Sequence, residues 1–266
     1  MPVSIDDASS VRISRDGPVY SVTICRPEVR NAVDATTARL LFEAFVSFDR
    51  DPEASVAVLT GVGDAFCAGA DLKAVAAGDR ADLSAAWCAG SLAPMGPSRL
   101  SLSKPVIAAI EGPAVAGGLE LALWADLRVA ARTAYFGVYC RRFGVPLIDL
   151  GTIRLPRLIG QSRAMDLILT GRTVDAQEAF EIGLANRLVG PGEALGASIE
   201  LARHLAQFPQ ACLRADRASV LAQWSLSDDQ AIDNELRGGL RVIESGETIR
   251  GALAFTRGRG RHGAFE

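Results

Sequence analysis

One stretch of the sequence places backbone N–H donors close to a carboxylate. It begins with the apolar run Val106–Ile110, which has the length of a buried strand, and a turn at Glu111-Gly112-Pro113 follows. Ala116-Gly117-Gly118 then leads into a predicted helix over residues 119–124. A strand, a glycine turn and a helix expose backbone N–H groups at the helix N-terminus, where negative charge is favoured. Glu120 follows among apolar neighbours, so this stretch predicts an active site with N–H donors beside a partly desolvated carboxylate.

The overall composition excludes several classes of protein. The chain has 266 residues, about half of them apolar (49%), and a formal charge of −3, which gives no general attraction to nucleic acid or to acidic membranes. No apolar run approaches the roughly 20 residues that span a bilayer. The N-terminal residues 1–7 lack a basic region followed by an apolar one, so no secretion signal is expected. We therefore expect a soluble, cytoplasmic protein.

The cysteines and histidines exclude other kinds of site. The five cysteines are widely spaced and form no C-x-x-C pair, so neither a disulfide framework nor a zinc site is predicted. The two histidines, His204 and His262, lie late in the chain, and no G-x-S-x-G motif is present, which argues against a Ser-His-Asp hydrolase. Catalysis is therefore expected to depend on carboxylates and backbone amides.

Strand and helix signals alternate along most of the chain and then give way to helices alone. Strands are predicted at 11–15, 19–25, 56–60, 106–110, 127–130 and 186–189, and helices at 34–49, 119–124, 151–158, 161–169 and 175–183. The segment after Asp71 predicts broken helices around Trp87, and residues 141–149 read as irregular. Residues 193–257 pattern as three or four helices. The fold class is therefore α/β followed by a helical C-terminal region, with the two parts assigned to residues 1–195 and 196–266.

Several of these segments together resemble the crotonase superfamily, the enoyl-CoA hydratase/isomerase group. The most specific matches are Ala65-Phe-Cys-Ala-Gly-Ala-Asp-Leu72 and Lys104-Pro-Val-Ile-Ala-Ala-Ile-Glu-Gly112. Ala116-Gly-Gly-Leu-Glu-Leu121, Ala125-Asp126 and Leu169-Thr-Gly171 also match, in the same order along the chain. The resemblance covers nearly the whole chain. It implies a spiral of ββα turns, a helical tail used in forming trimers or dimers of trimers, and acyl-CoA thioester substrates.

The resemblance also implies roles for individual residues around a thioester. The backbone amides of Ala70 and Gly117 would hold the thioester oxygen as an enolate forms, and losing one such donor typically costs about 10²–10³ in rate. Small residues at both loops let the substrate approach the backbone closely. The positions that match the CoA contacts of the family are Arg30, Ala32, Ala68, Asp71 and Leu72.

Hydratases of this family use two glutamates, and the sequence retains one of them. Glu120 matches the first, and burial in an apolar helix should raise its pKa and suit it to acid/base work. The second would follow Phe136-Gly137 as F-G-x-x-E, but Cys140 stands there. Its role is either to fill the gap with a small side chain or to act as a thiol whose pKa the neighbouring arginines lower. Asp149 is either a substitute acid or the cap of the helix that begins near Gly151.

Two further regions have roles by resemblance alone. Residues 80–102 would shape the acyl pocket, with Trp87, Leu92 and Met95 as its candidates or as simple core residues. At the C-terminal end, Arg257 and Arg259 would contact CoA phosphates or belong to a solvated tail. The G-x-G-x-x-G at 258–263 has no preceding strand and no following helix, so a dinucleotide site is excluded.

Together these features predict an enoyl-CoA hydratase-like lyase that acts on an acyl-CoA thioester. Isomerase, thioester hydrolase and decarboxylase chemistries need the same N–H pair and stay open, as does an acyl-CoA-binding protein without catalysis. No metal or redox cofactor is expected, because CoA enters as part of the substrate. The expected partners are the substrate and further copies of the chain, and neither nucleic acid nor a membrane.

Overall fold

A computed structural model describes residues 9–78 and 90–260. The chain divides into two compact units, Met1–Arg203 and His204–Glu266. The first unit carries all the strands of the described chain, and the second is helical. The sequence-based boundary at 195/196 falls inside helix α7 (Ala194–Ala206).

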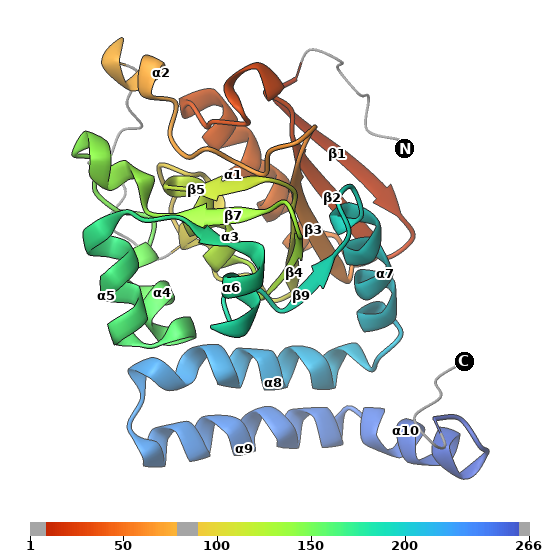
Figure 1. The fold of residues 1–266 in the computed structure, drawn as a ribbon. Coiled ribbons are helices and arrows are strands. Elements are labelled where there is room, and N and C mark those ends of the chain that lie inside the picture. Colours follow the sequence, from red (N-terminus) through yellow and green to blue (C-terminus); the bar gives the residue numbers. More distant parts are fainter. Residues whose placement is uncertain (1–8, 79–89, 261–266) are drawn as a thin grey trace. The chain divides into compact units, whose positions relative to one another are not determined.

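The first unit is built on a six-stranded sheet with the order β1-β2-β3-β4-β6-β9 (Figure 1). The strands are β1 (Val11–Asp16), β2 (Val19–Ile24), β3 (Val56–Gly61), β4 (Val106–Ile110), β6 (Leu127–Ala131) and β9 (Arg187–Val189). β1 and β2 form an antiparallel hairpin, and every later neighbour in the sheet pairs in parallel. β3 and β4 are buried along their whole length, as parallel strands covered on both faces are. The predicted strands are confirmed within one or two residues at each end.

A second, three-stranded sheet has the order β5-β7-β8. It consists of β5 (Pro113–Val115), β7 (Tyr135–Gly137) and β8 (Val174–Asp175). The sequence predicted neither β5 nor β7 as a strand, and it indicated only a turn at Glu111-Gly112-Pro113. Gly112, with φ +53°, does turn the chain, and its neighbour Pro113 then opens β5. A strand this short leaves no alternating pattern from which it could be predicted.

Helix α1 (Ala35–Arg50) packs on the core with the face that carries Leu41, Ala44, Phe45 and Phe48. Asp34 caps it, because its carboxylate accepts a hydrogen bond from the Thr37 N–H at 2.8 Å. Phe45 meets Trp124 of α3 (Gly117–Trp124) edge to face, with 4.7 Å between the ring centroids. Residues 118–124 of α3 are all buried, so this helix is enclosed on every side.

Four further helices belong wholly to the first unit: α2 (Leu72–Ala76), α4 (Gly151–Ile159), α5 (Gln161–Thr170) and α6 (Ala176–Glu181). The boundary between the two units falls within the last turn of α7. Short 3-10 helices lie at Pro27–Val29, Pro97–Arg99 and Tyr139–Phe143. The last of these replaces part of the segment predicted to be irregular. The prediction around Trp87 concerns residues outside the described ranges.

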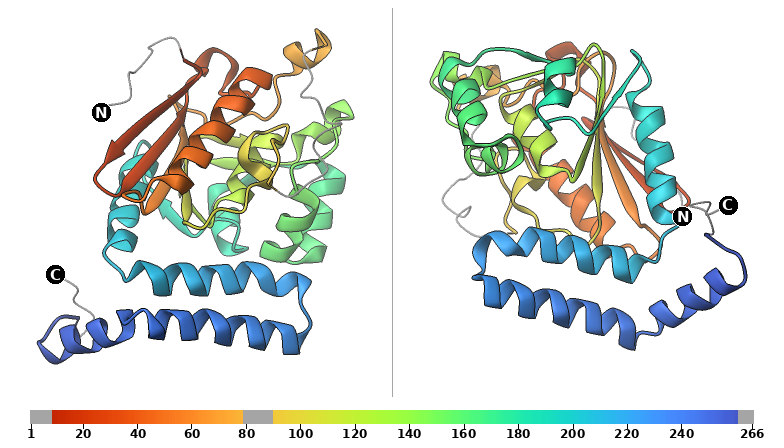
Figure 2. Two further views of the ribbon diagram at one scale, coloured as in Figure 1. Left: turned by 180° about the vertical axis from the view of Figure 1, so that it is seen from behind. Right: turned by 60° about the horizontal axis from the view of Figure 1, so that its bottom comes forward.

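The second unit contains α8 (Gln210–Ala222), α9 (Asp228–Glu244) and α10 (Glu247–Thr256). α8 and α9 run side by side in both views of Figure 2, and Ser227 begins α9 with a capping box. The Glu247 carboxylate accepts hydrogen bonds from the first N–H groups of α8. With α7, the predicted three or four C-terminal helices are four. Within the described residues, no helix is both long enough and apolar enough to cross a membrane.

Candidate active site

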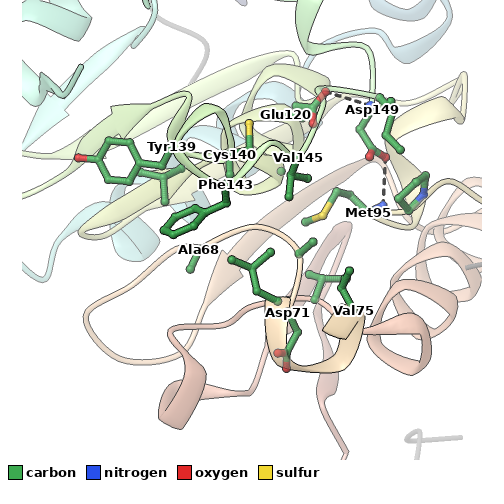
Figure 3. Close-up of a pocket in the computed structure, with 18 of the residues that line it drawn as sticks. Ala68, Asp71, Val75, Met95, Glu120, Tyr139, Cys140, Phe143, Val145 and Asp149 are labelled. Carbon is green, nitrogen blue, oxygen red and sulfur yellow. Dashed lines mark hydrogen bonds between the residues drawn. The ribbon is translucent and has the colours of Figure 1, made fainter. Parts of the chain in front are cut away.

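A cavity of about 630 Å³ opens in the first unit between the loop before α2, the start of α3 and the segment before α4. Figure 3 shows side chains from these elements pointing into it. Most of its wall is apolar and comes from Leu72, Val75, Met95, Phe143, Val145 and Ile148. The wall also includes Ala70, Gly117, Glu120 and Asp149, so the cavity brings together all four residues predicted to be catalytic.

The amides of Ala70 and Gly117 come from two loops in close contact. A Cβ placed on Gly69 would lie 2.8 Å from the Gly117 nitrogen, and Gly69 has φ +94°. Among the described residues, neither the Ala70 N–H nor the Gly117 N–H has a hydrogen-bond acceptor. Two unpaired donors on the wall of one cavity can stabilise a single oxyanion.

In each of these two loops, the backbone conformation fixes the position of the donor N–H group. In the first, the Val33 N–H donates to the Gly69 oxygen (2.8 Å) and the Asp71 N–H donates to the Val33 oxygen (2.9 Å). This leaves the Ala70 N–H directed elsewhere. In the second, Ala116 has φ +54°, which is rare for a residue with a side chain. Gly117 follows as the first residue of α3, where an N–H group has no acceptor within the helix.

Asp71 anchors the loop that carries Ala70. One of its carboxylate oxygens caps α2, and the other pairs with Arg26 at 3.0 Å. Arg26 also pairs with Asp34, the cap of α1, at 3.1 Å. Burial opposes ionisation of Asp71, but the hydrogen bonds from the Ala74 N–H and from Arg26 outweigh it, and the pKa of Asp71 is held below its usual value. The loop is therefore fixed to two helix N-termini through charge.

Glu120 lies in the cavity wall with only 3% of its surface exposed. Its Oε1 accepts hydrogen bonds from the Asp149 N–H (2.9 Å) and the Gly151 N–H (2.8 Å), as the sticks in Figure 3 show for Asp149. Burial first, and then the charge of Asp149, raise the pKa of Glu120 to about 8. The predicted rise is confirmed. A carboxyl with a pKa near 8 is suited to give and take protons at physiological pH.

Asp149 is buried beside Glu120, with 2% of its surface exposed. Its Oδ1 accepts hydrogen bonds from the Met95 N–H at 3.0 Å and from the Ser98 hydroxyl, and burial raises its pKa. The prediction that Asp149 caps the helix near Gly151 is wrong. Leu150 is the residue that flanks α4 at its N-terminus, and the carboxylate that accepts from the first N–H group of the helix, that of Gly151, belongs to Glu120.

Cys140 fills the position predicted to lack a carboxylate. It is 7% exposed and lines the cavity. Burial first, and then the charge of Glu120, raise its pKa; Arg141 opposes this without reversing it. The proposal that neighbouring arginines lower the pKa of this thiol is therefore wrong, and Cys140 is a small, un-ionised part of the wall.

The predicted CoA contacts divide between the cavity and the rest of the fold. Arg30, Ala68, Asp71 and Leu72 line the cavity. Ala32 does not; it is buried, and its carbonyl accepts from Arg26 at 2.6 Å. These roles stay predictions.

The other candidates lie elsewhere. Met95 lines the cavity, whereas Leu92 does not, and Trp87 lies outside the described residues. Arg257, an exposed residue at the end of α10, belongs with Arg259 to the second unit, so neither is placed relative to the cavity. Their contact with CoA phosphates stays a prediction.

The sequence did not predict that two polar residues, Ser98 and Arg154, belong to the site. Ser98 holds the Asp149 carboxylate, and Arg154 donates to the carbonyls of Ser98 and Asp149. Ser98 and Arg154 are 56 positions apart in the sequence. No local spacing could have paired them.

Known proteins resemble this chain over nearly its whole length. A family model described as enoyl-CoA hydratase/isomerase matches residues 14–260. A carnitinyl-CoA dehydratase of Salmonella arizonae is 37% identical over 95% of this chain and 97% of its own length. Enoyl-CoA hydratase EchA19 of Mycobacterium tuberculosis is 34% identical, with 96% and 97% covered.

Solved structures that resemble this chain are enoyl-CoA hydratases as well. The crystal structure of enoyl-CoA hydratase EchA1 from Mycobacterium marinum matches with a TM-score of 0.86 and 34% identity, over 93% of this chain and 96% of that one. An enoyl-CoA hydratase from Mycobacterium tuberculosis also matches with a TM-score of 0.86, at 37% identity and with the same coverage. The chain belongs to the enoyl-CoA hydratase/isomerase family and has the crotonase fold.

Proposed function

We propose that this protein is an enoyl-CoA hydratase-like lyase that adds water to the α,β double bond of an acyl-CoA thioester, or removes it. The observation that carries the proposal is the cavity in which two backbone donors, Ala70 and Gly117, share a wall with Glu120 and have no acceptor among residues 9–78 and 90–260. Relatives named enoyl-CoA hydratase and carnitinyl-CoA dehydratase carry out reactions of this class.

The two donors stabilise the charge that develops on the thioester oxygen. When the oxygen of water bonds to the β-carbon, the electrons of the double bond move towards the carbonyl and give an enolate. The N–H groups of Ala70 and Gly117 then hold the enolate oxygen. Because both donors are fixed by backbone, they need no reorganisation as this charge appears.

In this proposal, the carboxyl groups carry out the proton transfers. In the hydration direction, ionised Glu120 takes a proton from water as the C–O bond forms, and a protonated carboxyl returns one to the α-carbon. Asp149 is the second carboxyl in our proposal, since it faces the same cavity from a segment hydrogen-bonded to Glu120. Dehydration runs through the same steps in reverse. No metal or redox cofactor is part of this proposal, and CoA enters with the substrate.

We also propose a homotrimer or a dimer of trimers in the cytoplasm. The helical second unit supports the oligomer, because α9 exposes Ile232, Leu236, Leu240 and Ile243 at near-helical spacing. Light scattering of the full chain would give its mass in solution. A monomer at micromolar concentration would contradict this part of the proposal.

Turnover of defined thioesters tests the reaction. The protein would be incubated with enoyl-CoA, 3-hydroxyacyl-CoA and aryl-CoA thioesters. Products would be separated by chromatography and identified by mass, so that an isomer of unchanged mass is also detected. A gain or loss of 18 mass units, for water, supports the proposal. Double-bond migration, free CoA or loss of CO₂ would instead identify isomerase, hydrolase or decarboxylase chemistry. Binding without any conversion would show the non-catalytic alternative.

A pair of matched variants locates the chemistry. Glu120→Gln keeps an oxygen that can accept from the Asp149 and Gly151 N–H groups but cannot exchange a proton. We expect kcat to fall by about 10²–10⁴. The control is Glu111→Gln, whose carboxylate lies outside the cavity lining and accepts from the Ala194 N–H. Equal turnover by both variants would refute the role of Glu120.

A further inference from the structure

Arg154 of α4 connects the two segments that carry the hydrogen-bond partners of the active-site carboxyls. Its Nη1 donates to the Asp149 carbonyl at 3.2 Å, and its Nη2 donates to the Ser98 carbonyl at 2.7 Å. Ser98 and Asp149 lie 51 positions apart in the sequence, yet the Ser98 hydroxyl donates to the Asp149 carboxylate. The Arg154 guanidinium therefore holds the backbones of Ser98 and Asp149 together. Ser98 in turn orients the Asp149 carboxylate.

The same backbone orients Glu120. The carbonyl of Asp149 is bound by Arg154, and its N–H donates to Glu120 Oε1 at 2.9 Å. A displacement of residue 149 would therefore move a hydrogen-bond donor of Glu120 and the carboxylate of Asp149 together. Arg154 itself is not part of the cavity wall, so it does not touch a substrate there.

Arg154 also supplies charge to this region. Burial lowers its pKa to about 10, while the nearby Glu120 and Asp149 charges oppose that change, so the side chain is cationic at neutral pH. Its charge favours the ionised forms of both carboxyls. Among the other charged groups, Arg99 acts on Asp149, and Arg157 and Asp126 act on Arg154. The Cys140 thiol in the same cavity wall is in turn influenced by the charges of Glu120 and Arg141.

We propose that Arg154 is a positioning residue of the active site, which fixes both carboxyls through the carbonyls of Ser98 and Asp149 and favours their ionised forms. The inference rests on the function proposed above. It assigns Arg154 two separable actions, one through hydrogen bonds and one through charge. Lysine retains the charge but cannot reproduce the planar, forked donation to two carbonyls, whereas methionine retains neither.

The test compares Arg154→Lys and Arg154→Met with the wild type across pH, with a hydratable thioester as substrate. We expect Arg154→Met to lower kcat by about 10²-fold, the effect typical of a misplacement near 1 Å, with little change in KM. The pH at which kcat/KM is half-maximal on the rising limb of the pH profile should increase by about one unit, because removing a positive charge from beside Glu120 raises the pKa of its carboxyl. Arg154→Lys should lose kcat but keep the position of that limb. Arg163→Met, an exposed site on α5, is the control.

A purely structural role predicts a different result. Both variants would then lose activity in proportion to their loss of folded protein, with the limb at the wild-type position, and that outcome would overturn the proposal. Circular dichroism and thermal midpoints give the folded fraction. If Arg154→Met does not fold, the lysine variant still decides: wild-type kcat in this variant would refute positioning through the carbonyls.

A second measurement keeps this inference separate from the proposed reaction. The carboxyl of Glu120 can be titrated by ¹³C NMR in the ligand-free protein, with Glu120→Gln used to assign its signal. A higher titration midpoint in Arg154→Met than in Arg163→Met supports the electrostatic action even if the wild type turns over no thioester. Equal midpoints would refute that action. Absence of turnover in the wild type would refute the proposed function alone.

Discussion

Replacing Glu120 by glutamine should change how the stability of the protein depends on pH. The pKa of Glu120 is raised from 4.5 to about 8, chiefly by burial. Between these two values the unfolded chain ionises while the folded site stays protonated. The folded state therefore loses stability as the pH rises from about 4.5, and this loss is complete above about 8. Glutamine does not ionise and removes this dependence.

The size of the effect follows from the two pKa values. Each pKa unit corresponds to about 1.36 kcal/mol, so the difference of 8 − 4.5, about 3.5 units, amounts to roughly 5 kcal/mol. Glu120 is 3% exposed, so solvent screening reduces this little. Relative to the wild type, Glu120→Gln should therefore gain several kcal/mol between pH 5 and pH 8.5. Most of the gain should appear by pH 8.

Urea unfolding at both pH values measures the difference. The free energy of unfolding of each protein is extrapolated to zero denaturant, and the variant-minus-wild-type difference is compared between pH 5 and pH 8.5. Glu53→Gln, which removes an exposed carboxylate, controls for the loss of a charge as such. A difference for Glu120→Gln that changes by less than about 1 kcal/mol would refute the burial argument.

Three further substitutions test the frame of the site. Gly118→Ala should lower the free energy of unfolding by about 3 kcal/mol or more and abolish turnover, because its Cβ would lie 2.0 Å from the Cys67 carbonyl oxygen. Urea unfolding and kcat measure the two effects. Asp71→Ala loses the cap of α2 and a partner of Arg26, at about 1–3 kcal/mol near pH 7. That cost should shrink in acid, since the wild-type carboxylate stabilises the fold only when ionised, and unfolding at pH 7 and in acid measures the change. Arg128→Met leaves several buried carbonyls without their donor, so its thermal midpoint should fall by an amount equivalent to about 3 kcal/mol.

The sequence predicted the parts of the site that follow from local pattern. A strand, a glycine turn and an apolar helix placed Gly117 and Glu120 on one short segment, three residues apart. The raised pKa of Glu120 followed from its apolar neighbours. Helix α1 and its cap Asp34 were predictable because helical periodicity and an N-terminal aspartate lie within one window.

Long-range hydrogen bonds could not be predicted in this way. The Glu120 carboxylate accepts from Gly151, which lies 31 positions away, and thereby replaces Asp149 as the cap of α4. A Cβ on Gly151 would lie 2.7 Å from Glu120 Oε1, so the reason for glycine there is the carboxylate and not the turn. Periodicity describes one element at a time and contains no information about which distant element supplies a partner.

The replacement of the second glutamate by Cys140 is consistent with the proposed chemistry because another element supplies a carboxyl to the same wall. Cys140 and Asp149 stand at the two ends of one segment between β7 and α4, and both line the cavity. The thiol is buried and un-ionised, so it places no second negative charge beside Glu120 from that end. Asp149 does so from the other end, and its charge helps to raise the pKa of Glu120. In the proposed reaction, Asp149 therefore supplies the second carboxyl in place of a residue at position 140, and Ala70 and Gly117 supply the backbone donors for the thioester oxygen.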